Sequence, residues 1–151
     1  MRIRSVTVGP ETVEAVVAFA DGEPLRTSEV PDAAARALRA LPGLRGHRCD
    51  NADGRSFADE LSDTELAHLL EHATLEIMAM AGSPDTLRGE TSWDFRADGR
   101  GVFRVRVGYD DDLVCLGALK TAAALVNALA DGAPSADVDA EAAKLRRLRR
   151  S

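Results

Sequence analysis

One segment, residues 63–81, constrains the fold most strongly because it carries a sustained helical repeat. When its residues are placed at about 100° per residue, the apolar side chains gather on one broad face and the ionisable ones on the other. Ser62 and Glu65 stand at capping-box spacing, and Gly82 ends the pattern. The apolar face consists of Leu66, Leu69, Leu70, Ala73, Ile77 and Met80. The sequence therefore predicts a long amphipathic helix that packs its apolar face on another layer and leaves the opposite face in water.

The other patterned segments predict an antiparallel sheet and a second long helix. Within residues 1–20, two apolar runs flank a Gly-Pro breaker, which is typical of paired strands. Further strands are expected near residues 90–96 and 102–109, joined by a hairpin loop at 97–101, and further helices near 31–41 and 113–130. In residues 133–151 we expect a C-terminal helical tail in water. This order predicts an α+β fold, with an antiparallel sheet and two long helices packed on one face.

Composition narrows the class of protein. A chain of 151 residues fits a single domain (1–151) with a real apolar core. The formal charge of -6 argues against nucleic-acid binding, which needs a basic face. The N-terminus lacks a signal-peptide core, and no apolar run approaches the roughly 20 residues that span a bilayer. Two distant cysteines, Cys49 and Cys115, are too few for a disulfide framework, so we expect reduced thiols in a cytoplasmic protein with no membrane partner.

The polar face of the 63–81 helix carries the motif His68-Leu69-Leu70-Glu71-His72. Residues four apart on a helix project side by side, so both imidazoles can bind one zinc ion at about 2.0 to 2.1 Å. Glu71 flanks the same ion, where it can take a proton from a water whose pKa falls toward about 7. H-x-x-E-H is an inverted form of the metallohydrolase motif H-E-x-x-H. The spacing is equally compatible with ordinary surface pairs, so the motif alone leaves both interpretations open.

A catalytic zinc needs a third protein ligand, which the sequence does not fix. Glu76 continues the i, i+4 series, but it lies roughly 12 Å along the axis from the first histidine. We therefore expect Glu76 to orient His72 rather than to bind metal.

Better candidates for the third ligand come from other elements. His47 is the first choice, and Glu90, Asp112 of the acidic run 110–112, and Cys49 are further possibilities. Each has an ordinary structural alternative: Asp112 is well placed to cap the second long helix, and a cysteine is more often a small buried residue than a ligand.

With these residues in view, the chain resembles the N-terminal domain of cyanophycin synthetases over about residues 40–132. The segments that carry the resemblance, in order, are Leu41-Pro42-Gly43-Leu44, His47 and Cys49, the run from His68 to Glu76, Ala81-Gly82, Gly101-Val102-Phe103 and Tyr109. The resemblance implies an α+β fold and, in some members, a zinc-dependent site that cleaves the polymer's peptide-like bonds to make primers. It implies His68 and His72 as zinc ligands and Glu71 as general base. Pitrilysin-type peptidases and S-ribosylhomocysteine lyase share the short motif alone.

Two departures from the family pattern matter. The sequence ends where the synthetases continue into ATP-using ligase modules, so we expect no polymerisation by their mechanism. The family tends to carry a G-[RK]-T-R segment after the motif helix, which here reads Gly89-Glu90-Thr91-Ser92. The missing basic residues at Glu90 and Ser92 bear on substrate recognition, and Arg88 is the nearest candidate to replace them.

Three hypotheses follow. The first is a zinc-dependent metallohydrolase acting on a peptide or isopeptide-type bond in a peptide-like or polymer substrate. The second is a non-catalytic module that keeps the fold and binds a partner, and the third is a purely structural surface helix. The apolar faces of the two long helices are either fully used by the sheet or partly left for a homodimer.

Overall fold

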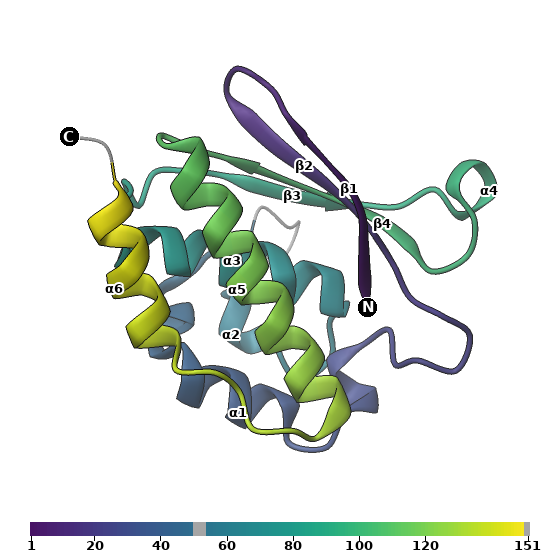
Figure 1. Ribbon diagram of the computed structural model, residues 1–151. Helices are drawn as coiled ribbons and strands as arrows, with labels where there is room; N and C mark the ends of the chain where they lie inside the picture. Colours follow the sequence, from purple (N-terminus) through teal and green to yellow (C-terminus); the bar gives the residue numbers. More distant parts are fainter. Residues whose placement is uncertain (50–53, 150–151) are drawn as a thin grey trace.

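A computed structural model describes residues 1–49 and 54–149 (Figure 1). Its sheet has four strands in the order β1-β2-β4-β3, and every neighbouring pair is antiparallel. The strands are β1 (Arg2–Val8), β2 (Thr12–Ala18), β3 (Gly89–Ser92) and β4 (Val102–Gly108). The two edge strands are therefore β1 and β3, which lie at opposite sides of the sheet.

Alternation along the central strands gives the sheet one apolar and one polar face. Val13, Ala15 and Val17 of β2 and Phe103, Val105 and Val107 of β4 are buried. Side chains at the positions between them face the other way, because successive residues of a strand point to opposite faces. On that outer face, Glu14 binds Arg104 at 3.2 Å and Arg106 at 2.9 Å.

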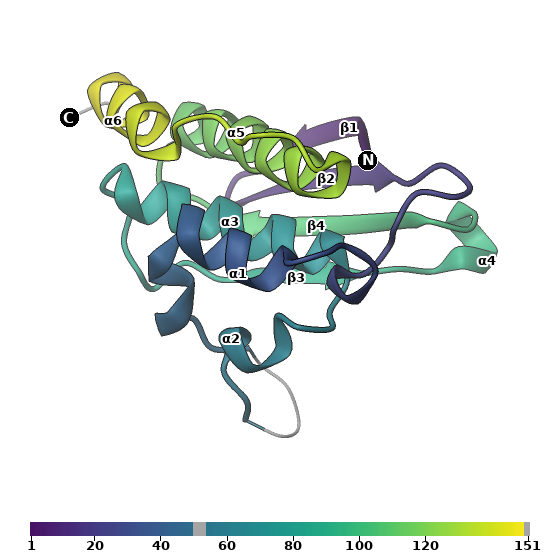
Figure 2. The same ribbon diagram turned by 90° about the horizontal axis from the view of Figure 1, so that it is seen from below.

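Two long helices, α3 (Leu66–Met80) and α5 (Asp112–Asp131), pack together on the apolar face of the sheet (Figures 1 and 2). They are flanked by α1 (Ala33–Ala40) and α6 (Val138–Leu148). The short helices are α2 (Phe57–Glu60), α4 (Phe95–Asp98) and the 3-10 turns η1 (Thr27–Glu29) and η2 (Pro42–Gly46). The predicted α+β fold, with two long helices on one face of an antiparallel sheet, is confirmed.

The structure corrects three local predictions. The capping box at Ser62 and Glu65 is absent: Glu65 is itself the N-cap of α3, which begins at Leu66. The expected strand near 90–96 ends at Ser92, and α4, which Asp94 caps, takes the last two residues of that strand and the first two of the expected hairpin loop.

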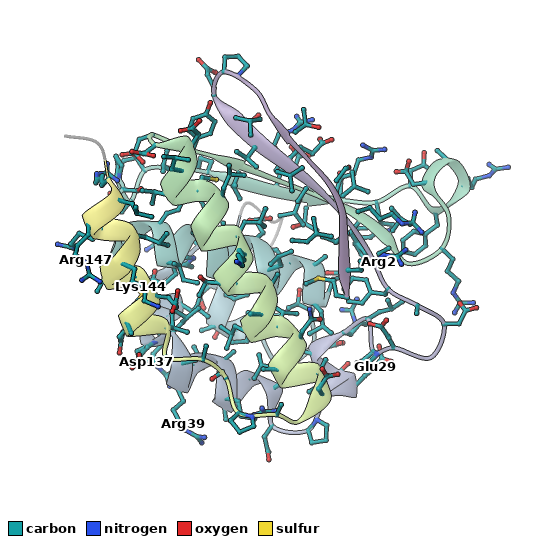
Figure 3. All side chains as sticks on the ribbon, in the orientation of Figure 1. Arg2, Glu29, Arg39, Asp137, Lys144 and Arg147 are labelled. Atoms are coloured by element: carbon teal, nitrogen blue, oxygen red, sulfur yellow. The ribbon has the colours of Figure 1, made fainter. Side chains whose placement is uncertain are left out.

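The C-terminal tail is not a solvated helix. α6 packs on α5 and α3, and its Val138, Ala142 and Leu145 are buried. Gly117 of α5 permits this close approach, because a Cβ there would meet the Leu145 side chain at 2.2 Å. The charged side of α6, including Lys144 and Arg147, stays exposed, as does Arg39 of α1 (Figure 3).

Among the described residues, α5 is the one helix long and apolar enough to cross a membrane, judged by length and composition alone. Half of its apolar window is buried inside the protein. Its contacts with α3 and α6 are those of a core helix. Arg36 of α1 ties down its C-terminal end by donating to the carbonyls of Leu129, Ala128 and Ala133.

Candidate metal centre

The polar side of α3 is buried, which corrects the prediction that it faces water. Glu71 and His72 are only 5% and 4% exposed. Strand β3 packs on one flank of α3, and η2 with the chain that follows it packs on the other. The helix is therefore covered on both sides, and the third hypothesis, a surface helix, does not describe it.

Three ligand-type side chains meet at this covered side. The Nε2 atoms of His68 and His72 lie 3.1 Å apart. The Sγ atom of Cys49 lies 3.8 Å from His68 Nε2 and 3.5 Å from His72 Nε2. Tetrahedral zinc with bonds of about 2.0 to 2.3 Å would hold such atoms about 3.3 to 3.6 Å apart. The three distances scatter around this range, and the Cys-His-His set has the donor atoms of a site that could hold a metal ion.

Burial keeps the two imidazoles neutral. Burial, with smaller contributions from His68 and His47, lowers the pKa of His72 to about 2. Burial also lowers the pKa of His68, against the opposing effect of Glu60 and Glu65. A neutral imidazole keeps a lone pair on one ring nitrogen, which is the form that binds metal.

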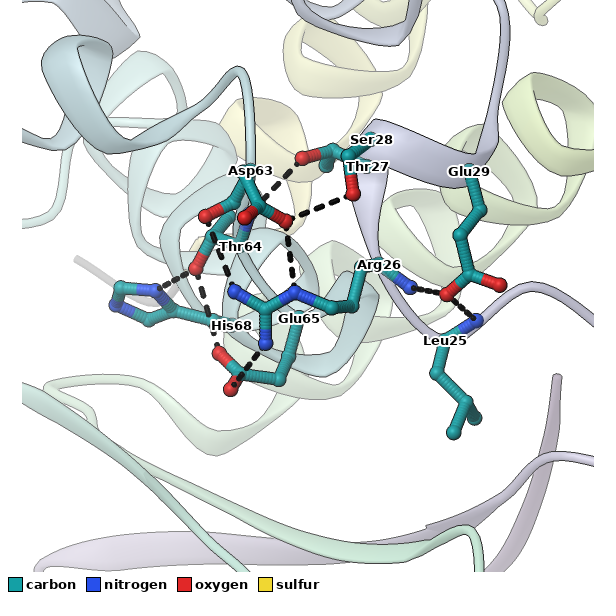
Figure 4. Close-up of polar contacts among 9 residues, drawn as sticks. All are labelled: Leu25, Arg26, Thr27, Ser28, Glu29, Asp63, Thr64, Glu65 and His68. Carbon is teal, nitrogen blue, oxygen red and sulfur yellow. Dashed lines mark hydrogen bonds and ion pairs between the residues drawn. The ribbon is translucent and has the colours of Figure 1, made fainter.

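A hydrogen-bond chain fixes which nitrogen of His68 carries that lone pair (Figure 4). His68 Nδ1 lies 2.9 Å from Thr64 Oγ1, and the Thr64 hydroxyl donates to Glu65 Oε2 at 3.4 Å. Glu65 in turn accepts from Arg26 at 3.0 Å. With Thr64 donating to Glu65, the Thr64 oxygen can accept from His68 Nδ1–H, and in that arrangement His68 Nε2 has its lone pair facing Cys49.

A second chain orients His72 through His47. His72 Nδ1 lies 2.9 Å from His47 Nδ1, and His47 Nε2 lies 2.7 Å from Glu76 Oε2. With His47 donating to the Glu76 carboxylate, His47 Nδ1 accepts from His72 Nδ1–H, and His72 Nε2 has the lone pair. A Cβ at Gly43 would meet Glu76 Oε1 at 1.8 Å, so Gly43 makes room for this carboxylate.

The two chains revise the expected roles of His47 and Glu76. His47, the first choice for third ligand, contacts the Nδ1 edge of His72, and one ion cannot be bound by both edges of that ring. The structure brings Cys49 to the Nε2 edge instead. We expected Glu76 to orient His72 directly. It instead reaches His72 through His47.

The remaining two candidates lie apart from the three ligand-type atoms. Glu90 is exposed on β3, at a position whose side chain points away from α3. Asp112 is the first residue of α5, whose N-cap is Asp111 rather than Asp112. Neither residue belongs to the Cys-His-His group, which the described residues form from Cys49, His68 and His72.

Glu71 lies beside the three ligand-type side chains. Its Oε2 atom is 3.5 Å from His72 Nε2, and its Oε1 accepts a hydrogen bond from the Thr91 hydroxyl at 2.8 Å. A Cβ at Gly89 would lie 2.7 Å from Glu71 Cγ and 2.9 Å from Glu71 Oε2. Gly89 and Thr91 of β3 therefore hold the carboxylate in place.

Sequence reasoning missed four residues that shape this site. Besides Thr64, Gly89 and Thr91, the Phe57 ring stacks on His72 with ring centres 3.9 Å apart. Thr64 precedes His68 by one helical turn, which is a usable signal. Gly89 and Thr91 are the two residues that this chain shares with the family segment G-[RK]-T-R, whereas nothing in the sequence pattern singles out Phe57.

The site opens into a cleft of about 1270 Å³. The side chains around it include eight carboxylates but only four guanidinium groups, and Arg26 is paired with Asp63 and Glu65. The cleft is thus polar and predominantly acidic. That charge suits a neutral or cationic chain better than a polyanion.

A family model, described as the cyanophycin synthase-like N-terminal domain, matches residues 15–131. The matched span contains both hydrogen-bond chains, the Cys-His-His group and β3. A comparison with curated proteins finds no match.

Proposed function

Because the chain belongs to the family of cyanophycin synthase-like N-terminal domains, we propose that it is a zinc-dependent metallohydrolase cleaving a peptide or isopeptide-type bond. The observation that carries this proposal is the position of Glu71. A carboxylate lies 3.5 Å from the His72 nitrogen that faces Cys49 and His68. A purely structural metal site has no need of such a neighbour.

In this proposal Cys49, His68 and His72 hold the zinc. Zinc, when bound, supplies a Lewis acid that polarises a carbonyl and lowers the pKa of water toward about 7. Three protein ligands leave a fourth position for water or substrate, as catalytic zinc sites require. A cysteine ligand also needs a reduced thiol, and Cys49 is a thiol rather than half of a disulfide, in keeping with the cytoplasmic location that we propose.

Glu71 moves the proton. Thr91 holds its Oε1, and its Oε2 lies 3.5 Å from His72 Nε2 beside the proposed ligands, so Oε2 is the atom that accepts a proton from the attacking water. The same atom then delivers that proton to the leaving amine. Gly89 and Thr91 restrict the carboxylate to this position, while Phe57 packs on the histidine rings and excludes water from that side.

The substrate we propose is a peptide-like polymer with cyanophycin as the first candidate, and nucleic acid is disfavoured by the acidic cleft. The family segment bears on this choice. Gly89 and Thr91, which contact Glu71, are retained, whereas Glu90 and Ser92 lie at the alternate positions of β3, beside Arg104 and Arg106 on the outer face. The substitutions therefore leave the contacts of Glu71 with β3 intact and change the outer side of β3, where Glu90 also borders the cleft.

Metal analysis tests the site directly. We expect about one zinc per chain in protein purified without a histidine tag, and loss of that zinc in His68→Ala and Cys49→Ala. Cys115→Ala is the matched control, because this cysteine is buried on α5 away from the cleft. His47→Gln should keep the stoichiometry at saturating zinc. Metal-free wild-type protein, or zinc retained by Cys49→Ala, would contradict the assigned ligands.

A turnover assay separates the enzyme from the alternative, a non-catalytic binding module. The alternative is favoured by Glu90 and Ser92, which replace the basic residues of the family segment. Release of soluble fragments from cyanophycin by the zinc-loaded protein supports the enzyme. Glu71→Gln should abolish that release while zinc stays bound, because the amide keeps the shape but cannot accept the proton. Equal turnover by Glu71→Gln would refute the role of Glu71, and binding of cyanophycin without cleavage by the wild type would favour the module.

A further inference from the structure

We infer that the free edge of β3 is a docking edge for an extended peptide main chain, which adds to the sheet as a fifth strand. This inference rests on the proposed function, since it assigns how the substrate of that same site is held. β3 ends the sheet order β1-β2-β4-β3, so among the described residues one of its sides has no strand beside it. Addition of a peptide to such an edge is a general mode of main-chain recognition.

The ladder shows which main-chain groups of β3 lie on the free side. Gly108 N donates to Arg88 O at 2.8 Å, which makes Arg88 and Gly108 a hydrogen-bonded pair. In an antiparallel ladder, hydrogen-bonded and non-hydrogen-bonded residue pairs alternate. Glu90 and Ser92 therefore also bond to β4, whereas Gly89 and Thr91 direct their N–H and C=O groups away from it. Within the described part of the chain, no hydrogen bond meets these outward groups of Gly89 and Thr91.

The same two residues contact the proposed general base. The side chain of Thr91 donates to Glu71, and Gly89 lies against the Glu71 carboxylate. Both residues line the cleft that contains the Cys-His-His group. A strand added to β3 would lie about 4.8 Å from it. A peptide paired there therefore runs through the cleft past Glu71.

The position of β3 favours a peptide over a second copy of this chain. β3 has four residues and forms a wall of the cleft, so a partner strand must enter the cleft to reach it. β1, at the opposite edge of the sheet, has seven largely exposed residues and is better suited to pairing between copies. The acidic lining of the cleft also repels a second copy of an acidic chain.

The test uses the zinc-loaded wild-type protein and two hydroxamates. Acetohydroxamate probes the zinc site alone, and acetyl-tetraalanine hydroxamate adds a main chain with no large side chains. Trp93, the single tryptophan, is half-exposed at the cleft and reports binding by its fluorescence. We expect the peptide to bind at least about 10-fold more tightly, because two residues of β3 offer several hydrogen bonds.

A scan of single N-methyl groups along the four amides gives the decisive pattern. Only alternate peptide residues bond to a neighbouring strand, so methylation should weaken binding about 3- to 10-fold at alternate amides and leave those between them nearly unchanged. A uniform effect at all four amides, or equal affinity of the two hydroxamates, would overturn the docking edge while leaving the zinc site intact. Failure of acetohydroxamate to bind would instead overturn the proposed function, and this inference with it.

A protein variant provides an independent measurement. Proline is tolerated at an edge position whose N–H faces outward, so Thr91→Pro removes one docking donor without breaking a bond to β4. Thr91→Val is the matched control, because it loses the hydroxyl but keeps the N–H. Thr91→Pro should bind the tetraalanine compound about 3- to 10-fold more weakly than Thr91→Val. Equal affinities of the two variants, with acetohydroxamate binding unchanged, would contradict the docking edge.

Discussion

Acidification should destabilise the metal-free protein well above the pH at which its carboxylates titrate. Burial lowers the pKa of His72 to about 2, whereas an unfolded histidine titrates near 6.5. Below pH 6.5 the unfolded state therefore binds a proton that the folded state refuses. Stability rises with pH wherever the unfolded state holds more protons, so it is lost as the pH falls through the unfolded value.

The magnitude follows from linkage. Each pH unit below 6.5 costs about 1.4 kcal/mol for a histidine that stays neutral in the folded state. Between pH 7 and pH 5, His72 alone should lower the free energy of unfolding by about 2 kcal/mol. His68 acts in the same direction, because burial lowers its pKa too. The carboxyl groups with lowered pKa values, such as Asp63 and Asp110, also stabilise the folded state. That stabilisation is lost only at lower pH, where these groups become protonated.

Urea unfolding measures the difference. Chelator-treated, reduced protein would be unfolded at pH 7 and at pH 5, with the free energy extrapolated to zero urea. His72→Gln is the control, because glutamine does not titrate, and its stability should fall by about 2 kcal/mol less than that of the wild type over the same range. Equal losses in the two proteins, or no loss in the wild type, would refute the conclusion that His72 is held neutral by burial.

Three further predictions concern the supports of the site and of the core. Gly89→Ala should lower turnover of cyanophycin by about 100-fold, because its Cβ would displace Glu71, while Gly46→Ala, whose Cβ meets nothing within 4 Å, should leave it unchanged. Thr64→Val should weaken zinc binding about 10- to 100-fold in competition with a chelator, without changing the saturating stoichiometry. Arg36→Met should lower the free energy of unfolding by about 2 kcal/mol in urea, since it removes the charged donor that links α1 to the carbonyls of Leu129 and Ala133 at the end of α5.

The sequence was sufficient for the fold because the strongest patterns are local. A period of two in β4 and a helical period in α3 and α5 determine which faces are apolar, and the two long amphipathic helices are the elements available to cover the apolar face of the sheet. Boundaries were less accurate where tertiary contacts compete with local signals. Glu65 has capping-box spacing from Ser62, but its carboxylate binds Arg26, which comes from 39 residues away, and α3 starts later as a result.

The candidate site was only partly predictable, because its members obey different rules. His68, Glu71 and His72 share one helix, so their spacing alone places them together. His47 and Cys49 lie on irregular chain beyond η2. They are two positions apart, yet His47 contacts Nδ1 of His72 and Cys49 lies at its Nε2. An isolated bridge between Arg48 and Ser56 sets that direction, and it is a nonlocal contact with no sequence signature. The sequence could therefore name the candidates for third ligand, but its first choice, His47, lies at the Nδ1 edge of His72, and Cys49 lies at the Nε2 edge.

The error about the wet face reveals how the site is built. A helix with ionisable residues on one side is normally read as half in water, yet α3 is covered on that side by two backbone segments. Each of these two segments, β3 and η2, contacts a carboxylate of α3 through a glycine. Gly89 of β3 lies against Glu71, and Gly43 of η2 lies against Glu76. With a side chain at either glycine, the cover could not approach the helix while the carboxylate stayed in place. The two carboxylates are consequently separated by their covers, so that Glu71 is directed to the Nε2 edge of His72 and Glu76, through His47, to its Nδ1 edge. In the proposed function, Glu71 would handle protons and Glu76 would orient a metal ligand, a division of roles that five residues of spacing along a bare helix could not produce.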